Sequence, residues 1–256
     1  MSLGTMAAGE VTIGMSCPVV ALYAASAGVV SYSGGMDLAR GVSINPQITA
    51  ANANNIFYAN NGAAERGKPK FSNGTIGVTV DGLLIAAEKL ISGIPATSKE
   101  TVTVGSTDYE LTNNDDDQNI PYVGFGVVLK RQSNDQQFFR AWIYRKVQFA
   151  QFDVPANTEG ENIDWQTTAL SAGIFRDDTA KHAWRSISGP IETELEAYNV
   201  IRAFLGLAAA DTLPDIVQAA AQQQQETQAE QPAQQGEQAE QPAAGDTTPP
   251  AEEGNP

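Results

Sequence analysis

Few residues in this sequence could take part in covalent or metal chemistry. The 256-residue chain has one histidine, His182, and one cysteine, Cys17. His182 lies in the charged segment DDTAKHAW, whereas Cys17 lies far away in sequence in an apolar run. A nucleophile–base pair would have to use this histidine, and a thiolate zinc site would need more cysteines. We therefore expect a surface histidine, a buried cysteine, no catalytic residues, no cofactor and no metal; an enzyme is the least favoured class.

Two clusters of aspartates are the remaining candidates for metal ligands. Asp115, Asp116 and Asp117 are consecutive, and hard carboxylate oxygens suit Ca²⁺. An EF-hand loop needs alternating acids, a glycine and a terminal glutamate, whereas consecutive acids point in different directions. We expect a solvated loop here, with a weak cation contact as the alternative. The same expectation holds for Asp177 and Asp178.

The central segment carries glycines and cations that could in principle bind nucleotides. Gly124 and Gly126 lie within a predicted strand and lack the third glycine and the following helix of a phosphate-binding loop. They indicate a close approach of another segment, or a bulge. The next predicted strand places three cations, Arg140, Arg145 and Lys146, beside the aromatic residues Trp142 and Tyr144. Such residues can stack on bases, but in an acidic chain we expect the cations to pair with acidic neighbours.

Charge divides the chain into two parts. The formal net charge is −15, of which residues 218–256 contribute seven acids and no Lys or Arg, leaving −8 for residues 1–217. Residues 218–256 contain 11 Gln and 5 Pro and no apolar residue larger than Ala, so we expect a disordered tail. Residues 1–217 suffice for a single β domain. The acidic balance argues against binding nucleic acid through its phosphates and against docking on anionic membranes.

The N-terminal region carries no targeting signal that we recognise. It lacks a basic segment, and the apolar stretch at residues 18–27 is too short to cross a bilayer. We therefore expect a protein that is made and folded in a cytoplasm.

The elements that would position these residues are mainly strands. Residues 120–154 alternate as two long strands joined by a short polar turn, and the second strand carries large side chains on both faces, so both should be covered. Shorter runs predict strands at residues 19–23, 29–32, 41–49, 71–80, 162–172 and 183–188, and a hairpin from residues 101–104 and 109–111. Pro46 places its strand at a sheet edge. Apolar stripes predict helices over residues 83–91 and 192–205, and residues 52–69 form a long polar connection.

The order of these elements resembles that of the major tail protein, or tail-tube protein, of bacteriophages with long non-contractile tails. The resemblance covers about residues 11–190 and rests on GVSINPQIT at 41–49, FYANNG at 57–62, GTIGVTV at 74–80 before the helix at 83–91, PYVGFG at 121–126, and the strand at 139–149. It implies a β-sandwich or barrel with a flanking helix. It also implies that subunits close into hexameric rings, which stack into a tube that conducts the genome.

The same resemblance implies the partners and the location of the protein. Further copies of the chain would be its main partner, with other tail proteins at the tube ends. Genomic DNA would pass through without specific binding, and the protein would reside in the virion tail after assembly in the host cytoplasm. Ring stacking needs a reaching arm, which points to residues 52–69. The predicted assembly residues in and beside this segment are Phe57, Tyr58, Asn60, Asn61, Arg66 and Lys68.

Two alternatives remain open at this point. One is another virion component, such as a capsid decoration protein or a head-completion protein. The other is a soluble β-barrel that binds a small ligand. A ligand barrel would keep short loops, so the long connection at residues 52–69 favours an assembling protein.

Overall fold

The computed structural model describes residues 9–52, 55–158 and 165–214. The predicted tail at 218–256 and the domain boundary at residue 217 therefore lie outside the described residues. The described part is mainly β, with these elements in chain order: β1 (Val11–Ser26), β2 (Val29–Asp37), β3 (Gly41–Ala51), β4 (Ile56–Ala59), β5 (Gly62–Arg66), β6 (Lys70–Val80), α1 (Ile85–Ser92), β7 (Lys99–Val104), β8 (Thr107–Thr112), β9 (Val123–Ser133), β10 (Gln136–Phe149), β11 (Thr168–Phe175), β12 (Arg185–Ile187) and α2 (Glu194–Phe204).

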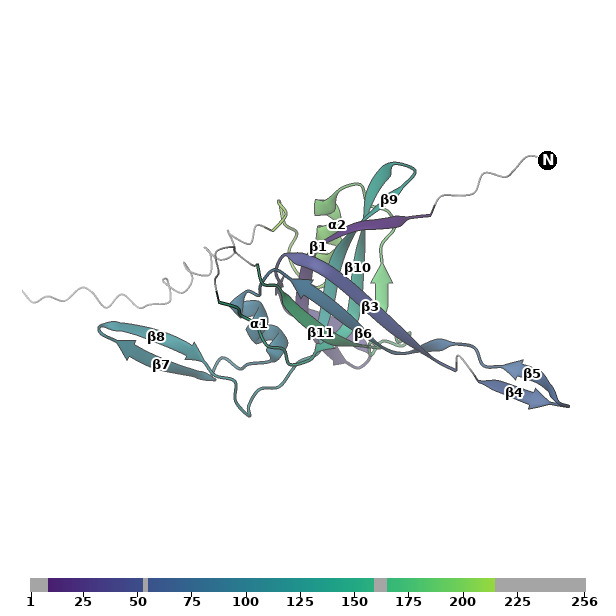
Figure 1. Cartoon of the computed structure of the whole chain (residues 1–256), viewed down its shortest axis with the longest axis horizontal. Coiled ribbons are helices and arrows are strands. Elements are labelled where there is room, and N and C mark those ends of the chain that lie inside the picture. Colours follow the sequence, from purple (N-terminus) through teal and green to yellow (C-terminus); the bar gives the residue numbers. More distant parts are fainter. Residues whose placement is uncertain (1–8, 53–54, 159–164, 215–256) are drawn as a thin grey trace, which may run out of the picture.

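Eight of these strands form one antiparallel sheet in the order β2-β1-β9-β10-β11-β6-β3, with β12 added to β10 (Figure 1). The predicted edge position of the strand containing Pro46 is confirmed, because β3 ends the sheet. The sheet curls until β3 approaches β1. The amide of Leu38, just before β3, donates to the carbonyl oxygen of Pro18 at 2.8 Å, and a Cβ on Gly41 would lie 2.5 Å from the methyl carbon of Met15. The body is therefore an open barrel, as expected from the sequence.

The two long central strands occupy the middle of this sheet. β9 and β10 pair directly, with Ile143 opposite Gly126 and Gln136 opposite Ser133. Their turn residues, Asn134 and Asp135, have φ of 47° and 63°, the backbone of a tight hairpin turn that matches strand twist. β6 joins the same sheet through β11, so the strand predicted at residues 71–80 lies in the same sheet as the two central strands.

Each face of the central hairpin is covered by a different helix. On the inner face, Phe125 and Tyr144 are fully buried in a cluster that includes Ala87 and Ile91 of α1. On the outer face, Val128, Ala141 and Ile143 pack against α2, together with its residues Tyr198 and Ile201. Burying such a side chain stabilises the fold by about 1.5–3 kcal/mol. The prediction that both faces are covered is confirmed.

The glycines of β9 provide the space in which α2 and its neighbours pack. A Cβ on Gly124 would lie 2.5 Å from the ring of Tyr32 and 2.6 Å from Leu205, and a Cβ on Gly126 would overlap Ile201. Real Cβ atoms do not approach other atoms so closely, so only glycine fits at these positions. Close approach, rather than phosphate binding, is therefore what these two glycines provide.

One part of the predicted alternation in β10 is wrong. The sequence pattern places residues 139–149 in simple alternation, with Ile143 and Val147 on one face. The register between β10 and β9 shifts between Tyr144 and Val147. Val147 and Phe149 therefore join Tyr144 in the inner cluster, while Ile143 stays in the outer one. A β-bulge inserts residues into one strand and exchanges the faces beyond it.

Both predicted helices are present and begin about two residues later than expected. α1 ends at Gly93, whose φ is 67°, and the amide of Ile94 donates to the carbonyl oxygen of Lys89 at 3.1 Å. α2 begins after Thr193, whose hydroxyl oxygen accepts from the amide of Glu196 at 3.2 Å. Such N-caps satisfy amides that have no partner inside the helix. Among the described residues, neither helix is long and apolar enough to span a membrane.

Two predicted strands have different limits in the structure. Residues 165–167, inside the strand predicted at 162–172, are irregular, residues 162–164 lie outside the described residues, and β11 continues to Phe175. β11 begins at Thr168 because its partner strand β6 ends there. Thr168 pairs with Val80, the last residue of β6, so earlier residues have no neighbouring strand with which to form backbone hydrogen bonds. β12 keeps only three residues of the strand predicted at 183–188.

Candidate assembly surfaces

The predicted connection at residues 52–69 contains a β-hairpin, which corrects the expectation of a polar loop. β4 and β5 pair only with each other and project from the body as an arm (Figure 1). Asn60 and Asn61 form the turn with φ of 52° and 63°. Asparagine tolerates such angles better than most residues, so the Asn-Asn-Gly sequence was a usable signal for this turn.

All six predicted assembly residues lie on or directly beside this arm. Phe57 and Tyr58 in β4 each expose 64% of their surface. Asn60 and Asn61 are at the tip, Arg66 ends β5 and Lys68 follows it, and all four are exposed. The arm therefore presents two large aromatic side chains away from the barrel core, on a two-stranded element that is marginal by itself in water.

A second hairpin, β7–β8, presents an apolar face that the sequence reasoning missed. Figure 1 shows it extending on the other side of the body from the β4–β5 arm. Val102 lies opposite Tyr109, and residues two apart share a face, so four apolar residues lie on one face: Val102, Val104, Tyr109 and Leu111. Their exposed fractions are 39, 63, 54 and 47%. We call this surface the ribbon face.

The opposite face of the β7–β8 hairpin is polar and internally bonded. Lys99 forms an ion pair with Glu110 at 2.8 Å, and Thr103 donates to Asp108 at 2.6 Å. The hairpin is thus amphipathic, although in the single chain the ribbon face is not packed on the core. The alternation of Val102 and Val104 was a usable signal for this face, because a strand buried on one side shows that pattern.

No family model matches the sequence, and no curated protein matches it either. The functional assignment therefore depends on the residues and their arrangement alone.

The cations of β10 pair with acids, as the sequence predicted. Arg140 bonds to Glu10 at 2.6 Å, Arg145 to Asp177 at 2.7 Å and Lys146 to Asp178 at 2.7 Å. The expectation of a solvated Asp177 is wrong, because its exposed fraction is 1%. Burial alone would raise the pKa of Asp177, but hydrogen bonds from Thr179 and Arg145 outweigh it and leave the pKa below its ordinary value.

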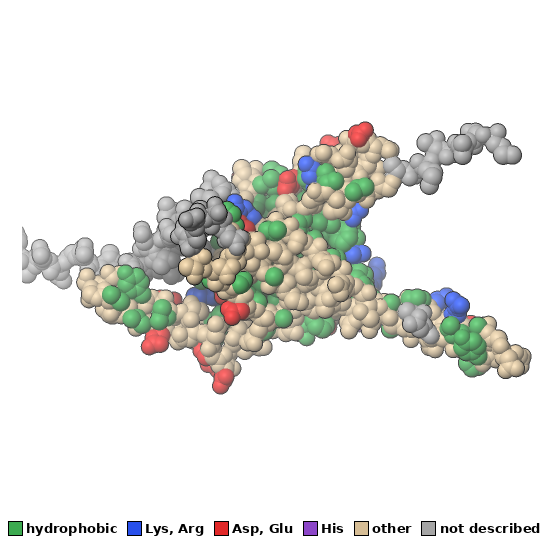
Figure 2. Space-filling view, in the orientation of Figure 1, with side chains coloured by type: hydrophobic (Ala, Val, Ile, Leu, Met, Phe, Trp, Pro, Cys, Tyr) green, Lys and Arg blue, Asp and Glu red, His purple; other side chains and the backbone are tan. Residues whose placement is uncertain are grey.

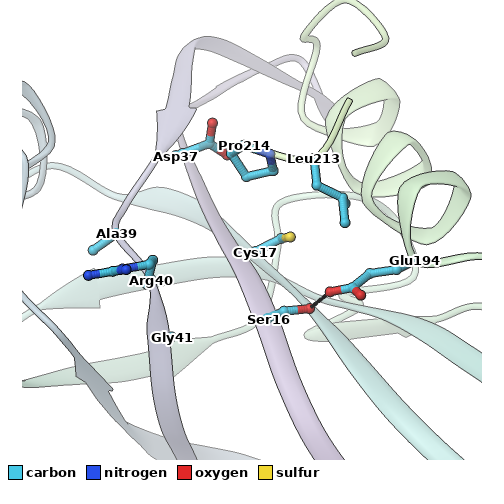
Figure 3. Close-up of a pocket in the computed structure, with 9 residues that line it drawn as sticks. All are labelled: Ser16, Cys17, Asp37, Ala39, Arg40, Gly41, Glu194, Leu213 and Pro214. Atoms are coloured by element: carbon cyan, nitrogen blue, oxygen red, sulfur yellow. Dashed lines mark hydrogen bonds between the residues drawn. The ribbon is translucent and has the colours of Figure 1, made fainter. Parts of the chain in front are cut away.

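The single cysteine lines a small cavity of about 220 Å³ between β1, the start of β3 and α2 (Figure 3). Cys17 is half-buried rather than buried, and its sulfur points into the space beside Leu213. Burial raises the pKa of its thiol to about 11, so the thiol is protonated and weakly nucleophilic at neutral pH. On the cavity wall, Ser16 donates a hydrogen bond to Glu194.

A half-buried carboxylate, that of Asp37, lines the same cavity. The hydroxyl group of Tyr198 donates to Asp37 at 2.7 Å. Burial raises the pKa of Asp37, and this hydrogen bond opposes that effect. The hydrogen bond between Asp37 and Tyr198 thus links the end of β2 to α2.

His182 is exposed, as predicted, and lines a different cavity from Cys17. Asp115, Asp116 and Asp117 are exposed in the loop after β8, where the side chain of Asp115 accepts the amide of Asp117 at 3.1 Å. Within the described ranges, no three His, Cys, Asp or Glu side chains gather closely enough to hold a metal ion.

Proposed function

We propose that this protein is a structural virion component whose copies assemble into stacked hexameric rings that form the tube of a phage tail. The observation that carries the proposal is the pair of projecting hairpins. Both expose large apolar side chains, Phe57 and Tyr58 on the arm and Val104 on the ribbon face, and both extend beyond the barrel. Such surfaces are typical of sites that another protein covers.

Covering these hairpins would favour assembly by a substantial free energy. Each large apolar side chain that leaves water contributes about 1.5–3 kcal/mol before the costs of association. The edge strands β2 and β3 each pair with only one strand of the sheet, so they offer further backbone groups to a neighbour. Contacts between unlike surfaces close a ring in one direction and continue as a stack in the other.

The charge of the chain suits a conduit for DNA. Residues 1–217 carry −8, and a channel lined with unpaired cations would retain the phosphate backbone by releasing its counterions. Arg140, Arg145 and Lys146, the cations of the central strand β10, are already neutralised by acids. We infer a lumen that is neutral or acidic, through which genomic DNA passes without specific binding.

The ligand-binding barrel is the less favoured alternative because the interior of the barrel is filled. Phe125, Tyr144 and Phe149 are at most 2% exposed and pack against one another there, with ring centroids of Phe125 and Phe149 6.2 Å apart. A ligand would have to displace this core. The proposal that the protein is no enzyme rests on the protonated Cys17 thiol and on the exposed His182 in a separate cavity.

Electron microscopy of the concentrated full-length protein, with a mass measurement in solution, tests the proposal. We expect rings and tubes, and a mass that rises in multiples of six chains. A protein that stays monomeric at every concentration would contradict self-assembly and return the ligand-binding barrel to first place. Single rings that never stack would favour a head-completion protein.

A further inference from the structure

Four cations gather around a shallow cavity at the junction of β6, β11 and β12. The cavity has a volume of about 440 Å³ and is lined by Lys70, Arg176, Lys181 and Arg185, together with His182. Lys70 begins β6, whereas the other four residues lie within residues 176–185, between the end of β11 and β12, so the fold brings Lys70 to this cationic stretch. We call this site the basic pocket.

Aromatic stacking holds the two arginines of the basic pocket in place. Phe71 and Trp184 stack with ring centroids 4.6 Å apart and an angle of 8° between the rings. The guanidinium carbon of Arg185 lies 4.6 Å from the Trp184 ring, and that of Arg176 lies 6.0 Å from the Phe71 ring. A guanidinium group fixed over an aromatic ring loses little further entropy when it binds an anion.

None of the four cations in the basic pocket forms an ion pair with an acid among the described residues. Six other cations of the chain do so, including Arg131, Arg140 and Arg145. In a chain with a net charge of −15, this concentration of unpaired positive charge is the exception. It is available to an anionic partner.

The loop between β8 and β9 has the complementary charge. Asp115, Asp116 and Asp117 are exposed, and no cation of the described residues forms an ion pair with them. Figure 1 shows this loop at the lower left of the body, whereas β12 and the start of β6 lie toward the right. In Figure 2 acidic side chains appear at the lower left and Lys and Arg side chains along the right edge.

We propose that the Asp115–Asp117 loop of one copy docks into the basic pocket of the next copy. The two surfaces are unlike and lie on different sides of the molecule, so the contact is heterologous and propagates from copy to copy. The inference rests on the proposed function, since it specifies one contact within the assembly. Complementary charge at this contact fixes the register of the copies and speeds their encounter.

Charge reversal tests the contact without disturbing the aromatic stack. Lys70 and Lys181 are exposed and make no hydrogen bond with a side chain of the described residues. In the full-length protein, K70E/K181E should raise the concentration at which assembly begins at least tenfold, measured by light scattering and sedimentation. D116K/D117K should do the same, and both variants should keep the wild-type melting temperature.

Mixing the two variants is the decisive experiment. In the K70E/K181E chain the two new glutamates cancel the charge of Arg176 and Arg185, so its pocket no longer attracts the acidic loop, whereas the D116K/D117K chain has a basic loop and a basic pocket. Neither variant can make the attractive contact with itself. In an equal mixture the acidic loop of the first meets the basic pocket of the second, and the lysines of the second loop meet the glutamates of the first pocket, so the mixture should assemble at a lower concentration than either variant alone. Failure of the mixture to assemble, with both variants folded, would overturn the inference.

Matched controls separate this inference from the proposed function. K89E/K130E makes the same change of charge outside the pocket and should assemble as the wild type does. If wild-type protein forms tubes and K70E/K181E forms them equally well, the docking inference is wrong while the proposed function stands. If wild-type protein never assembles, both are wrong.

The acidic tail is the competing occupant of the pocket. Residues 218–256 carry seven acids, so a full-length chain with these seven changed to their amides distinguishes the two. We expect that chain to assemble normally and to remain sensitive to K70E/K181E. Loss of that sensitivity would assign the pocket to the tail and overturn docking of the loop.

Discussion

The central hairpin β9–β10 and the hairpin β7–β8 have the same pattern of alternating apolar residues but differ in burial. Both are antiparallel pairs with apolar residues at alternate positions. In β9–β10, Phe125 and Ile143 lie beneath α1 and α2 on the two faces, with at most 3% exposed, whereas Val104 of the ribbon face is 63% exposed. Alternating apolar residues therefore favour a strand, but they do not determine whether another element packs on its apolar face. The apolar surface left uncovered is the one that we assign to assembly.

A charge in the central hairpin should have the largest effect. In Ile143→Asp, an unpaired carboxylate would be buried between the outer face of β10 and α2, which costs several kcal/mol and approaches the whole stability of a domain, about 5–15 kcal/mol. We expect no soluble folded protein. The control Val104→Asp places the same group on the ribbon face and should fold normally. Equal solubility and melting of the two variants would refute the comparison.

A single added methyl group under α2 should have the next largest effect. In Gly126→Ala the new methyl group would overlap Ile201, and overpacking of this kind costs about 1–3 kcal/mol. Urea unfolding should show that loss. Gly77→Ala is the matched control in β6, because its new methyl group would meet only the carbonyl oxygen of Asn45 at an ordinary 3.9 Å. If both substitutions have the same effect, α2 does not pack closely on β9.

The ion pair of the central hairpin should contribute more to the stability of the fold than the exposed ion pair of the β7–β8 hairpin. Asp177 is buried beneath Arg145 of β10, and its lowered pKa contributes stability that is present at neutral pH and lost as the pH falls through and below about 4. Asp177→Asn should therefore lower the melting temperature at pH 7, and the difference should shrink toward pH 3. In the exposed Glu110–Lys99 pair of the β7–β8 hairpin, Glu110→Gln should leave the melting temperature unchanged at both pH values. A constant difference for Asp177→Asn across this range would contradict the assignment.

Removing apolar character from the ribbon face should have the smallest effect on folding and a large effect on assembly. The triple variant V102T/V104T/L111T keeps residues that favour strands and touches no buried side chain, so the melting temperature of the subunit should not change. The concentration needed for tubes should rise at least tenfold, as measured by sedimentation. Thr101→Ser on the polar face is the control. Normal tubes from the triple variant would exclude the ribbon face from the assembly contact.

Much of the fold could be predicted from local patterns. The two central strands, the helices near Leu90 and Ile201 and the edge position of Pro46 follow from periodicity and turn residues. The bulge after Tyr144 could not be predicted, because the one extra residue that it inserts leaves the alternation in the sequence unbroken. The limits of β11 could not be predicted either, since they depend on where β6 ends.

The candidate sites were predictable to different degrees. The arm around Phe57 and Asn60 was identified as an assembly segment, although its hairpin was missed despite the turn signal. The burial of Asp177 was missed because its partner, Arg145, lies 32 residues away in the chain. Three cations of the basic pocket lie within residues 176–185 and are visible in the sequence, but Lys70 joins them only after β6, β11 and β12 are in place.

The sequence by itself determined where the two long central strands and both helices lie, that a single cysteine cannot form a disulfide within the chain, and that acids outnumber cations. Those properties are local or additive, so they do not depend on the path of the chain. Only the tertiary structure decided that Gly126 lies beneath Ile201, that Val104 stays uncovered, and that four cations share one cavity. Burial and charge pairing depend on segments distant in sequence, and the closure of the sheet selects which of those segments meet.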